Sequence, residues 1–275
     1  MAGIGKIGII GGGGWLGSAI ARSLIRAGAI EGSKLMCSYR SKMPTDDIPC
    51  DWTKNNGELV KRSEIVIVSV RPDDWPTLKI NARGKLVISV MAGVTIEDIR
   101  NRTGSTRAAR ALPNAAAELG FSYTPYFINS DDDHDASTVR AVFESCGDVD
   151  EVSEERHLDY FTAMSGSGAA FPALLAEAMM IDAVDRGIPS SIAIRAVQQV
   201  IIGAGRLQEA HREPPTETVK AFVDYRGTTA AGIVAMRDGG FENVVRAGLE
   251  AAFQKALGMS GSRPARVPGG DHKER

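Results

Sequence analysis

The chain has 275 residues, of which 43% are hydrophobic and 24% are charged, as in a soluble globular protein of one large or two ordinary domains. Its formal net charge of -2 favours neither nucleic acid nor an anionic membrane as a partner. The scattered cysteines, Cys37, Cys50 and Cys146, predict neither a zinc site nor a disulfide framework, and a reducing cytoplasmic compartment fits them. We see no signal-peptide pattern and no apolar run approaching the roughly 20 residues of a membrane span.

A strand pattern, a glycine-rich turn and the start of a helix follow one another at the N-terminus. The apolar run 7–10 leads into GGGGWLG, where Gly12, Gly14 and Gly17 have the spacing G-x-G-x-x-G. In a dinucleotide-binding turn, the first glycine permits the turn, the second lets the backbone approach the pyrophosphate, and the third lets the helix pack on the strand. The pyrophosphate lies on N–H groups at the positive end of the helix. A tight turn without a ligand is the alternative.

The end of the second predicted strand, 34–38, bears on the choice between nicotinamide cofactors. NAD enzymes usually place an acidic residue here to hold the ribose 2′-OH. This chain instead has Ser38, Tyr39, Arg40, Ser41 and Lys42. Two cations and three hydroxyls suit a 2′-phosphate, which favours NADPH and leaves NADH possible. Alternatively, the two cations belong to a solvated loop.

Strand and helix patterns alternate from the N-terminus to about residue 153. We predict helices over 16–27, 58–62 and 137–145, another beginning at Thr95, and a polar loop over 51–56. The continuous apolar runs 65–70 and 85–90 are typical of strands buried on both faces of a parallel sheet. Further strands are predicted over 107–112, 119–128 and 147–152. This alternation predicts a doubly wound α/β sheet, that is, a Rossmann-like dinucleotide-binding domain over 1–153.

The pattern changes to helix beyond residue 153. Long helices are predicted over 174–184, 192–207 and 241–257. The first, LLAEAMMIDAV, is apolar on most of its circumference and must be buried in a core or a subunit interface. We therefore expect an all-helical domain over 154–260, followed by a disordered tail over 261–275 that is rich in glycine, proline and charge.

Several motifs follow the N-terminal loop in an order that is specific. VSVRPDD resembles a strand ending in V-K-P, SVMAGVTIEDI resembles S-x-x-A-G-V-T-I, and RALPNAAAELG resembles R-x-M-P-N-t-p-a. AMSGSGAAFPALLAEA resembles S-G-S-G-P-A-Y, and RGTTAAGIVAMRDGGF resembles P-G-G-T-T-x-x-G followed by G-G-F. From Lys6 to about Met259 the chain thus resembles the pyrroline-5-carboxylate reductases, which make proline from a cyclic imine. The resemblance implies a Rossmann-like domain followed by an all-α dimerisation domain, and hence a homodimer or a larger assembly.

The resemblance also implies which residues contact the cofactor. They come from the glycine loop, the end of the second strand, one asparagine and the ends of two further strands: Gly12, Gly13, Gly14, Trp15, Leu16, Ser38, Tyr39, Arg40, Asn56, Val70, Arg71 and Ala92. Open α/β sheets bind ligands at such strand ends. For Val70 and Ala92, packing alone is the alternative.

Glu155, Gly227, Thr228 and Thr229 match family positions near the product amino acid. The Gly-Thr-Thr segment can begin a helix whose N–H groups and two hydroxyls face a carboxylate, or it can be an ordinary threonine N-cap. Thr229, directly or through a water, is the candidate catalytic partner of the imine nitrogen. Glu155 is equally well a solvated surface charge.

The chain departs from the family at three places. Tyr225 and Arg226 stand where the family has P-G, Ala221 replaces an asparagine, and Ala169 replaces the proline of S-G-S-G-P. These changes leave the fold and the reductase class intact. They leave open which imine is the substrate.

The expected reaction is hydride transfer from NADPH to the C=N carbon of a cyclic imino acid, first of all 1-pyrroline-5-carboxylate, giving L-proline. An imine reductase of the same fold with another cyclic imine is the alternative, and a non-catalytic NADPH-binding regulator is a further one. A β-hydroxyacid dehydrogenase is disfavoured, because such enzymes carry a catalytic lysine that is missing between Lys85 and Lys220. The four histidines lack metal-ligand spacing, so no metal is expected.

Overall fold

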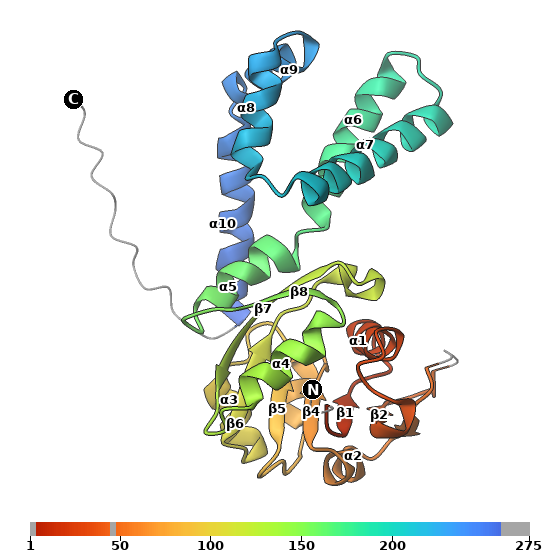
Figure 1. Cartoon of the computed structure of the whole chain (residues 1–275), viewed down its shortest axis with the longest axis vertical. Coiled ribbons are helices and arrows are strands. Elements are labelled where there is room, and N and C mark those ends of the chain that lie inside the picture. The colour runs from red at the N-terminus through yellow and green to blue at the C-terminus, as the bar shows by residue number, and fades with distance from the viewer. Residues whose placement is uncertain (1–3, 45–47, 260–275) are drawn as a thin grey trace, which may run out of the picture. The chain divides into compact units, whose positions relative to one another are not determined.

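The computed structural model describes residues 4–44 and 48–259 (Figure 1). These residues form two compact units, one comprising 4–167 with 252–259 and the other comprising 168–251. The domain boundary expected at 153/154 stays a prediction. The tail expected to be disordered, 261–275, lies outside the described residues.

The first unit is built on an eight-stranded sheet with the order β3-β2-β1-β4-β5-β6-β7-β8. Its strands are β1 Ile7–Ile10, β2 Leu35–Ser38, β3 Asp51–Thr53, β4 Ile65–Val68, β5 Leu86–Ser89, β6 Arg107–Ala111, β7 Ser122–Asn129 and β8 Gly147–Glu151. Neighbouring strands are parallel except β6 and β7. The chain order reverses between β1 and β4, and open α/β sheets bind ligands at such a switch point. The predicted Rossmann-like fold is confirmed.

Helices cover both faces of this sheet, so its central strands are buried throughout. Alternate side chains point to opposite faces. Ile9 and Ile67 pack with α1 Trp15–Arg26 and α4 Asp135–Glu144 on one face. Ile10 and Val68 pack with α2 Asn56–Arg62 and α3 Ile96–Thr103 on the other. The continuous apolar runs in the sequence reflect this burial on two sides.

One predicted loop is a strand, and three short 3-10 segments were not predicted. Residues 51–56 were expected to be a polar loop, but Asp51–Thr53 forms β3, which among the described strands pairs only with β2 at the sheet edge. An exposed edge strand lacks the apolar run that identified the central strands. The 3-10 segments are η1 Gly32–Lys34, η2 Pro72–Thr77 and η3 Ala115–Leu119. The remaining predicted elements of this unit lie within a few residues of the observed ones.

All described elements from residue 157 onward are helical, as predicted. The first unit includes α5 His157–Phe161 and the π-helical turn η4 Thr162–Gly166. The second unit contains α6 Ala170–Asp185, α7 Ser190–His211, α8 Pro215–Tyr225, α9 Thr228–Asp238 and the first part of α10 Phe241–Met259.

Helix α6 is apolar around its circumference, yet none of its residues is buried within the chain. Leu174 is 64% exposed and Ile181 is 50% exposed. The helical stretch His157–Asp185 is long and apolar enough to cross a membrane, by length and composition alone, so the expectation that no segment approaches a membrane span was wrong. An exposed apolar face of this kind requires a cover from outside the chain, either a protein surface or lipid.

Candidate active site

A cleft of about 620 Å³ lies in the first unit at the switch point of the sheet. Its walls come from the turn after β1, the loop after β2 and the segment after β4. Because β2 and β4 flank β1, the carboxyl end of β1 forms the floor between them. This is the position at which a Rossmann-like sheet holds a dinucleotide.

The glycine turn between β1 and α1 is so compact that side chains on its glycines would collide with neighbouring atoms. Gly11 has φ +80°, and a Cβ on it would lie 2.4 Å from the carbonyl oxygen of Ser69. A Cβ on Gly17 would lie 2.5 Å from the carbonyl oxygen of Gly11, which agrees with the close packing predicted for the third glycine. The tight turn was assigned to Gly12 from the sequence, but the left-handed residue is Gly11. Gly12 instead faces β2, since its Cβ would meet Cys37 at 2.7 Å.

Ser38 fixes this turn against the end of β2. Its hydroxyl accepts a hydrogen bond from the Gly11 N–H at 3.1 Å, and its carbonyl accepts one from the Gly13 N–H at 3.1 Å. Ser38 is buried, so it positions the glycine loop. Helix α1 begins after Gly14 with no side-chain cap and no acidic residue in its first turn, within the described chain. A helix start of this kind presents backbone N–H groups and positive potential to a phosphate.

The side of the cleft formed by the loop after β2 is aromatic and cationic. The Tyr39 ring meets Trp52 edge-on with centroids 6.2 Å apart, and the Lys54 Nζ lies 5.5 Å from the Tyr39 centroid. The Arg40 guanidinium donates to the Asp74 carboxylate at 2.8 Å. Cations along the cleft are Arg40, Lys42, Lys54, Arg71 and Lys79. Such a lining suits a ligand with several phosphates.

Most of the predicted cofactor residues meet in this cleft: Gly13, Gly14, Ser38, Tyr39, Arg40, Asn56, Val70 and Arg71. Gly12, Trp15, Leu16 and Ala92 are not part of its lining, and their cofactor contacts stay predictions. Sequence reasoning missed Lys54, Asp74 and Lys79. Lys54 was hidden because β3 was taken for a loop. The other two become relevant only when the segment after β4 is seen to face the loop after β2.

Glu155 is engaged inside the first unit. Its Oε1 accepts hydrogen bonds from the Ile96 N–H at 2.8 Å and from the Arg110 guanidinium at 2.9 Å. Arg110 is 1% exposed and also pairs with Asp159 at 3.4 Å. The alternative of a solvated surface charge is therefore wrong. Glu155 ties the start of α3 to β6, and its contact with substrate stays a prediction.

The motifs RALPN and SGSG meet through one asparagine. The Asn114 side-chain amide donates to the Ser165 carbonyl at 3.1 Å, and its oxygen accepts from the Ala116 N–H at 2.9 Å. Ser165 belongs to the π-helical turn η4. Single π-helical turns of this kind occur frequently at functional sites.

In the second unit, Gly227 is the N-cap of α9 and has φ +91°. Thr228 and Thr229 are thus the first two residues of the helix, so the alternative of a threonine N-cap is wrong. No side chain in the described chain caps this helix start. The preceding Arg226 has φ 64° and ψ -172°, a conformation that is essentially restricted to glycine. The segment therefore exposes hydroxyls and N–H groups beside a strained arginine.

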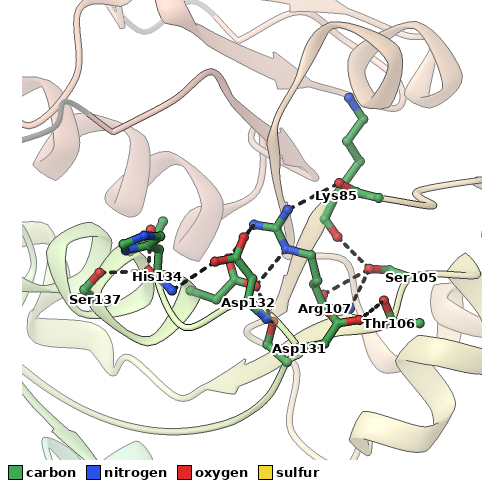
Figure 2. A network of polar contacts seen from close by, with 12 residues as sticks. Lys85, Ser105, Thr106, Arg107, Asp131, Asp132, His134 and Ser137 are labelled. Carbon is green, nitrogen blue, oxygen red and sulfur yellow. Dashed lines mark hydrogen bonds and ion pairs between the residues drawn. The ribbon is translucent and has the colours of Figure 1, made fainter.

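A separate polar cluster joins the first residue of β6 to the first residue of α4, at the amino-terminal end of that strand (Figure 2). Arg107 donates through Nε to the Asp135 carboxylate at 2.8 Å and lies 3.2 Å from Asp132. Asp135 also accepts a short hydrogen bond from Ser130. Burial opposes ionisation of Asp135, but the bonds from Arg107 and Ser130 outweigh it and hold the pKa of that carboxyl below its ordinary value. This cluster fixes the sheet to the helix.

Comparison with known proteins tests the family resemblance. A family model described as pyrroline-5-carboxylate reductase dimerisation matches residues 155–259, and one described as NADP oxidoreductase, coenzyme F420-dependent, matches residues 6–93. Mouse pyrroline-5-carboxylate reductase 3 is 28% identical over 270 residues, which cover 93% of this chain and 96% of that protein. Along almost its whole length the chain is similar to pyrroline-5-carboxylate reductases.

Solved structures agree with this similarity. The crystal structure of Plasmodium falciparum pyrroline carboxylate reductase with NADP bound has a TM-score of 0.80 at 27% identity and covers 93% of this chain and 98% of that one. A pyrroline-5-carboxylate reductase from Coxiella burnetii has a TM-score of 0.85 at 24% identity, with 95% and 100% covered, and supports the fold alone. The family resemblance predicted from the motifs is confirmed. It extends over both units of the chain.

Proposed function

We propose that the protein reduces 1-pyrroline-5-carboxylate to L-proline by hydride transfer from NADPH. One observation carries the proposal: a phosphate-ready, cation-lined cleft lies at the switch point of a chain similar along its length to pyrroline-5-carboxylate reductases. NADPH rather than NADH fits the cations that follow β2, because a 2′-phosphate requires charge-assisted hydrogen bonds. NADH remains an alternative donor.

The cleft can hold a dinucleotide with the residues that line it. The glycine turn leaves the backbone open to a pyrophosphate because side chains are excluded there. Tyr39 provides an aromatic surface beside the adenosine end, with Arg40 next to it. Bound NADPH supplies the hydride. The chain supplies the orientation of the cofactor through Gly13, Gly14 and Arg71 at the two sides of the β1 end.

The substrate is an imine that becomes electrophilic when protonated, so the protein needs placement and charge complementarity more than a strong acid. The N-terminal turn of α9 offers its N–H groups and the Thr228 hydroxyl to the substrate carboxylate. The Thr229 hydroxyl, directly or through a water, holds the imine nitrogen. Glu155 keeps the start of α3 in place and is proposed to lie near the amino-acid product.

We infer that the protein is a homodimer that forms through its helical region, with larger assemblies possible. The apolar surface of α6 is uncovered in the single chain, and α6 lies within the segment matched by the dimerisation family model. This match favours a protein surface over lipid as the cover of the stretch His157–Asp185. A cytoplasmic location follows as part of the proposal. Light scattering of the purified protein at twice the chain mass would support the dimer, and a monomer would refute it.

The substrate and cofactor are tested by following NADPH and NADH oxidation with 1-pyrroline-5-carboxylate and with its six-membered analogue. We expect faster turnover with the five-membered ring and NADPH. Preference for the six-membered ring would favour the alternative, an imine reductase acting on another cyclic imine. Tyr225 and Arg226 motivate that alternative, since they stand where the family has proline and glycine. NADPH binding without oxidation by any imine would indicate a regulator.

A further inference from the structure

The Arg40–Asp74 ion pair joins the two walls of the cofactor cleft. Arg40 lies in the loop after β2, and Asp74 lies in η2, after β4. Since β2 and β4 flank β1, the 2.8 Å contact crosses above the end of β1 and its glycine turn. Both residues line the cleft, so a ligand in it meets this ion pair.

The two partners differ in how firmly they are held. The Asp74 N–H donates to the Arg71 carbonyl at 2.9 Å, and the Asp74 carbonyl accepts from the Thr77 hydroxyl at 2.9 Å. The next residue, Trp75, is buried in the core. By contrast, the Arg40 side chain is 75% exposed and that of Asp74 is 40% exposed. The backbone of Asp74 is thus held by its neighbours, and its carboxylate positions the more exposed guanidinium.

Asp74 is also the exception in the charge of this cleft. Among the described residues that line it, Asp74 is the only carboxylate, against the cations Arg40, Lys42, Lys54, Arg71 and Lys79. A cleft built solely to attract phosphates would gain from an uncharged residue at this position. The Asp74 carboxylate instead forms an ion pair with Arg40, which immediately follows Tyr39 at the proposed adenosine end.

We propose that Asp74 sets cofactor selectivity. Its carboxylate pairs with Arg40 and thereby competes with the 2′-phosphate of NADPH for that guanidinium. This inference rests on the proposed use of NADPH. A 2′-phosphate takes Arg40 from Asp74 and leaves the carboxylate to solvent, whereas NADH binds with the ion pair intact. Asp74 thus lowers the affinity for NADPH and leaves that for NADH unchanged. Loss of the carboxylate makes the enzyme more selective for NADPH.

The size of the effect follows from the exposure of the pair. Solvent-exposed ion pairs are weak, and their loss corresponds to a change of about 1.5- to 5-fold in an equilibrium constant. We expect Asp74→Asn to lower the dissociation constant for NADPH by about this factor and to leave that for NADH unchanged. The change shrinks as salt is raised, because both charges are screened. In an Arg40→Gln background, Asp74→Asn has no effect, since the competing partner is gone.

The experiment is a fluorescence titration of the full chain with NADPH and with NADH, and a competition with 2′,5′-ADP, which carries the extra phosphate. The variants are Asp74→Asn, Arg40→Gln, the double variant and Asp73→Asn. The last removes the same charge from a neighbouring exposed carboxylate that is outside the ion pair, so it measures the general effect of charge. Thermal midpoints of all variants establish that each is folded.

We expect only Asp74→Asn to bind NADPH and 2′,5′-ADP more tightly than wild type does. The affinities of Asp73→Asn should stay close to those of wild type. Unchanged NADPH binding in Asp74→Asn, or an equal gain in Asp73→Asn, overturns the inference while the proposed function stands. Weaker NADH binding in Asp74→Asn also overturns it, because Asp74 would then hold the ribose hydroxyls. Failure of the wild type to bind NADPH removes the proposed function and the inference together.

Discussion

Gly17 and Gly14 lie in the same loop, but the structure predicts different consequences for adding a methyl group to each. A Cβ on Gly17 would lie 2.5 Å from the Gly11 carbonyl oxygen and 2.9 Å from the Gly12 Cα, both of which are backbone atoms. Ordinary van der Waals contact begins at 3.4 Å, so the helix must move by about 1 Å. On Gly14 the contact with the Gly11 carbonyl oxygen is 3.1 Å, and its φ of -82° suits alanine.

We therefore expect Gly17→Ala to cost about 1–3 kcal/mol of the unfolding free energy, as overpacking of a close contact does. For a unit of this size, that lowers the thermal midpoint by on the order of 2–10 °C. Because the displaced helix start also carries the N–H groups that we propose bind phosphate, NADPH affinity should fall by about tenfold or more. Gly14→Ala should keep the thermal midpoint within about 2 °C of wild type. It should nevertheless lower the affinity for NADPH, because the added methyl group lies at the lining of the cleft.

Differential scanning fluorimetry and NADPH titration of the two variants separate these effects. A Gly17→Ala protein with wild-type stability and wild-type affinity would refute the packing argument. A Gly14→Ala protein that binds NADPH normally would refute the placement of the pyrophosphate at this turn. Substitution of alanine for Gly57, an exposed residue of α2 whose added Cβ would meet only the Asn55 side chain, at 3.2 Å, provides a control.

Three further substitutions test other parts of the account. Arg226→Gly should raise the unfolding free energy by about 1 kcal/mol in a thermal or urea melt, because glycine adopts the strained φ of 64° without cost; a destabilised variant would contradict it. Asp135→Asn should lower it by about 1.5–3 kcal/mol at neutral pH, since hydrogen bonds with Arg107 and Ser130 are lost. Folding lowers the pKa of Asp135, so its contribution to the unfolding free energy is fully present above the ordinary pKa of 3.8 and is lost as the pH falls through the lower pKa of the folded state. The difference in unfolding free energy between wild type and Asp135→Asn should therefore narrow at acid pH. A difference that does not change with pH would argue against this role. Thr229→Ala should reduce kcat/KM about tenfold with NADPH affinity unchanged, and an unaffected kcat/KM would remove Thr229 from the mechanism.

The central sheet could be predicted because burial on both faces leaves a direct trace in the sequence. Strands β1, β4 and β5 are apolar except for Ser89 at the end of β5, and all of their residues are buried. The edge strand β3 left no such trace, since Asp51 is exposed and its pairing depends on β2 alone. The position of the left-handed glycine was also hidden, because any of four consecutive glycines can adopt a positive φ and only the structure shows that Gly11 does.

The residues that line the cleft were predictable where they follow a strand, as Arg40 and Arg71 do. Their partners were not, because a charge pair between residues 34 positions apart depends on how two loops face each other. The same holds for Glu155, whose partner Arg110 lies 45 positions away in β6. Charged side chains in loops read as solvated until the fold shows what they meet.

The most direct test follows the hydride itself. NADPH carrying deuterium at the transferred position of the nicotinamide C4 is mixed with the enzyme and 1-pyrroline-5-carboxylate, and the proline formed is analysed by mass spectrometry and NMR. The account predicts that the deuterium appears at the δ carbon of proline, the former C=N carbon, in proportion to the NADPH oxidised. Proline without deuterium, or NADPH that binds tightly but is not oxidised by this imine, would contradict it.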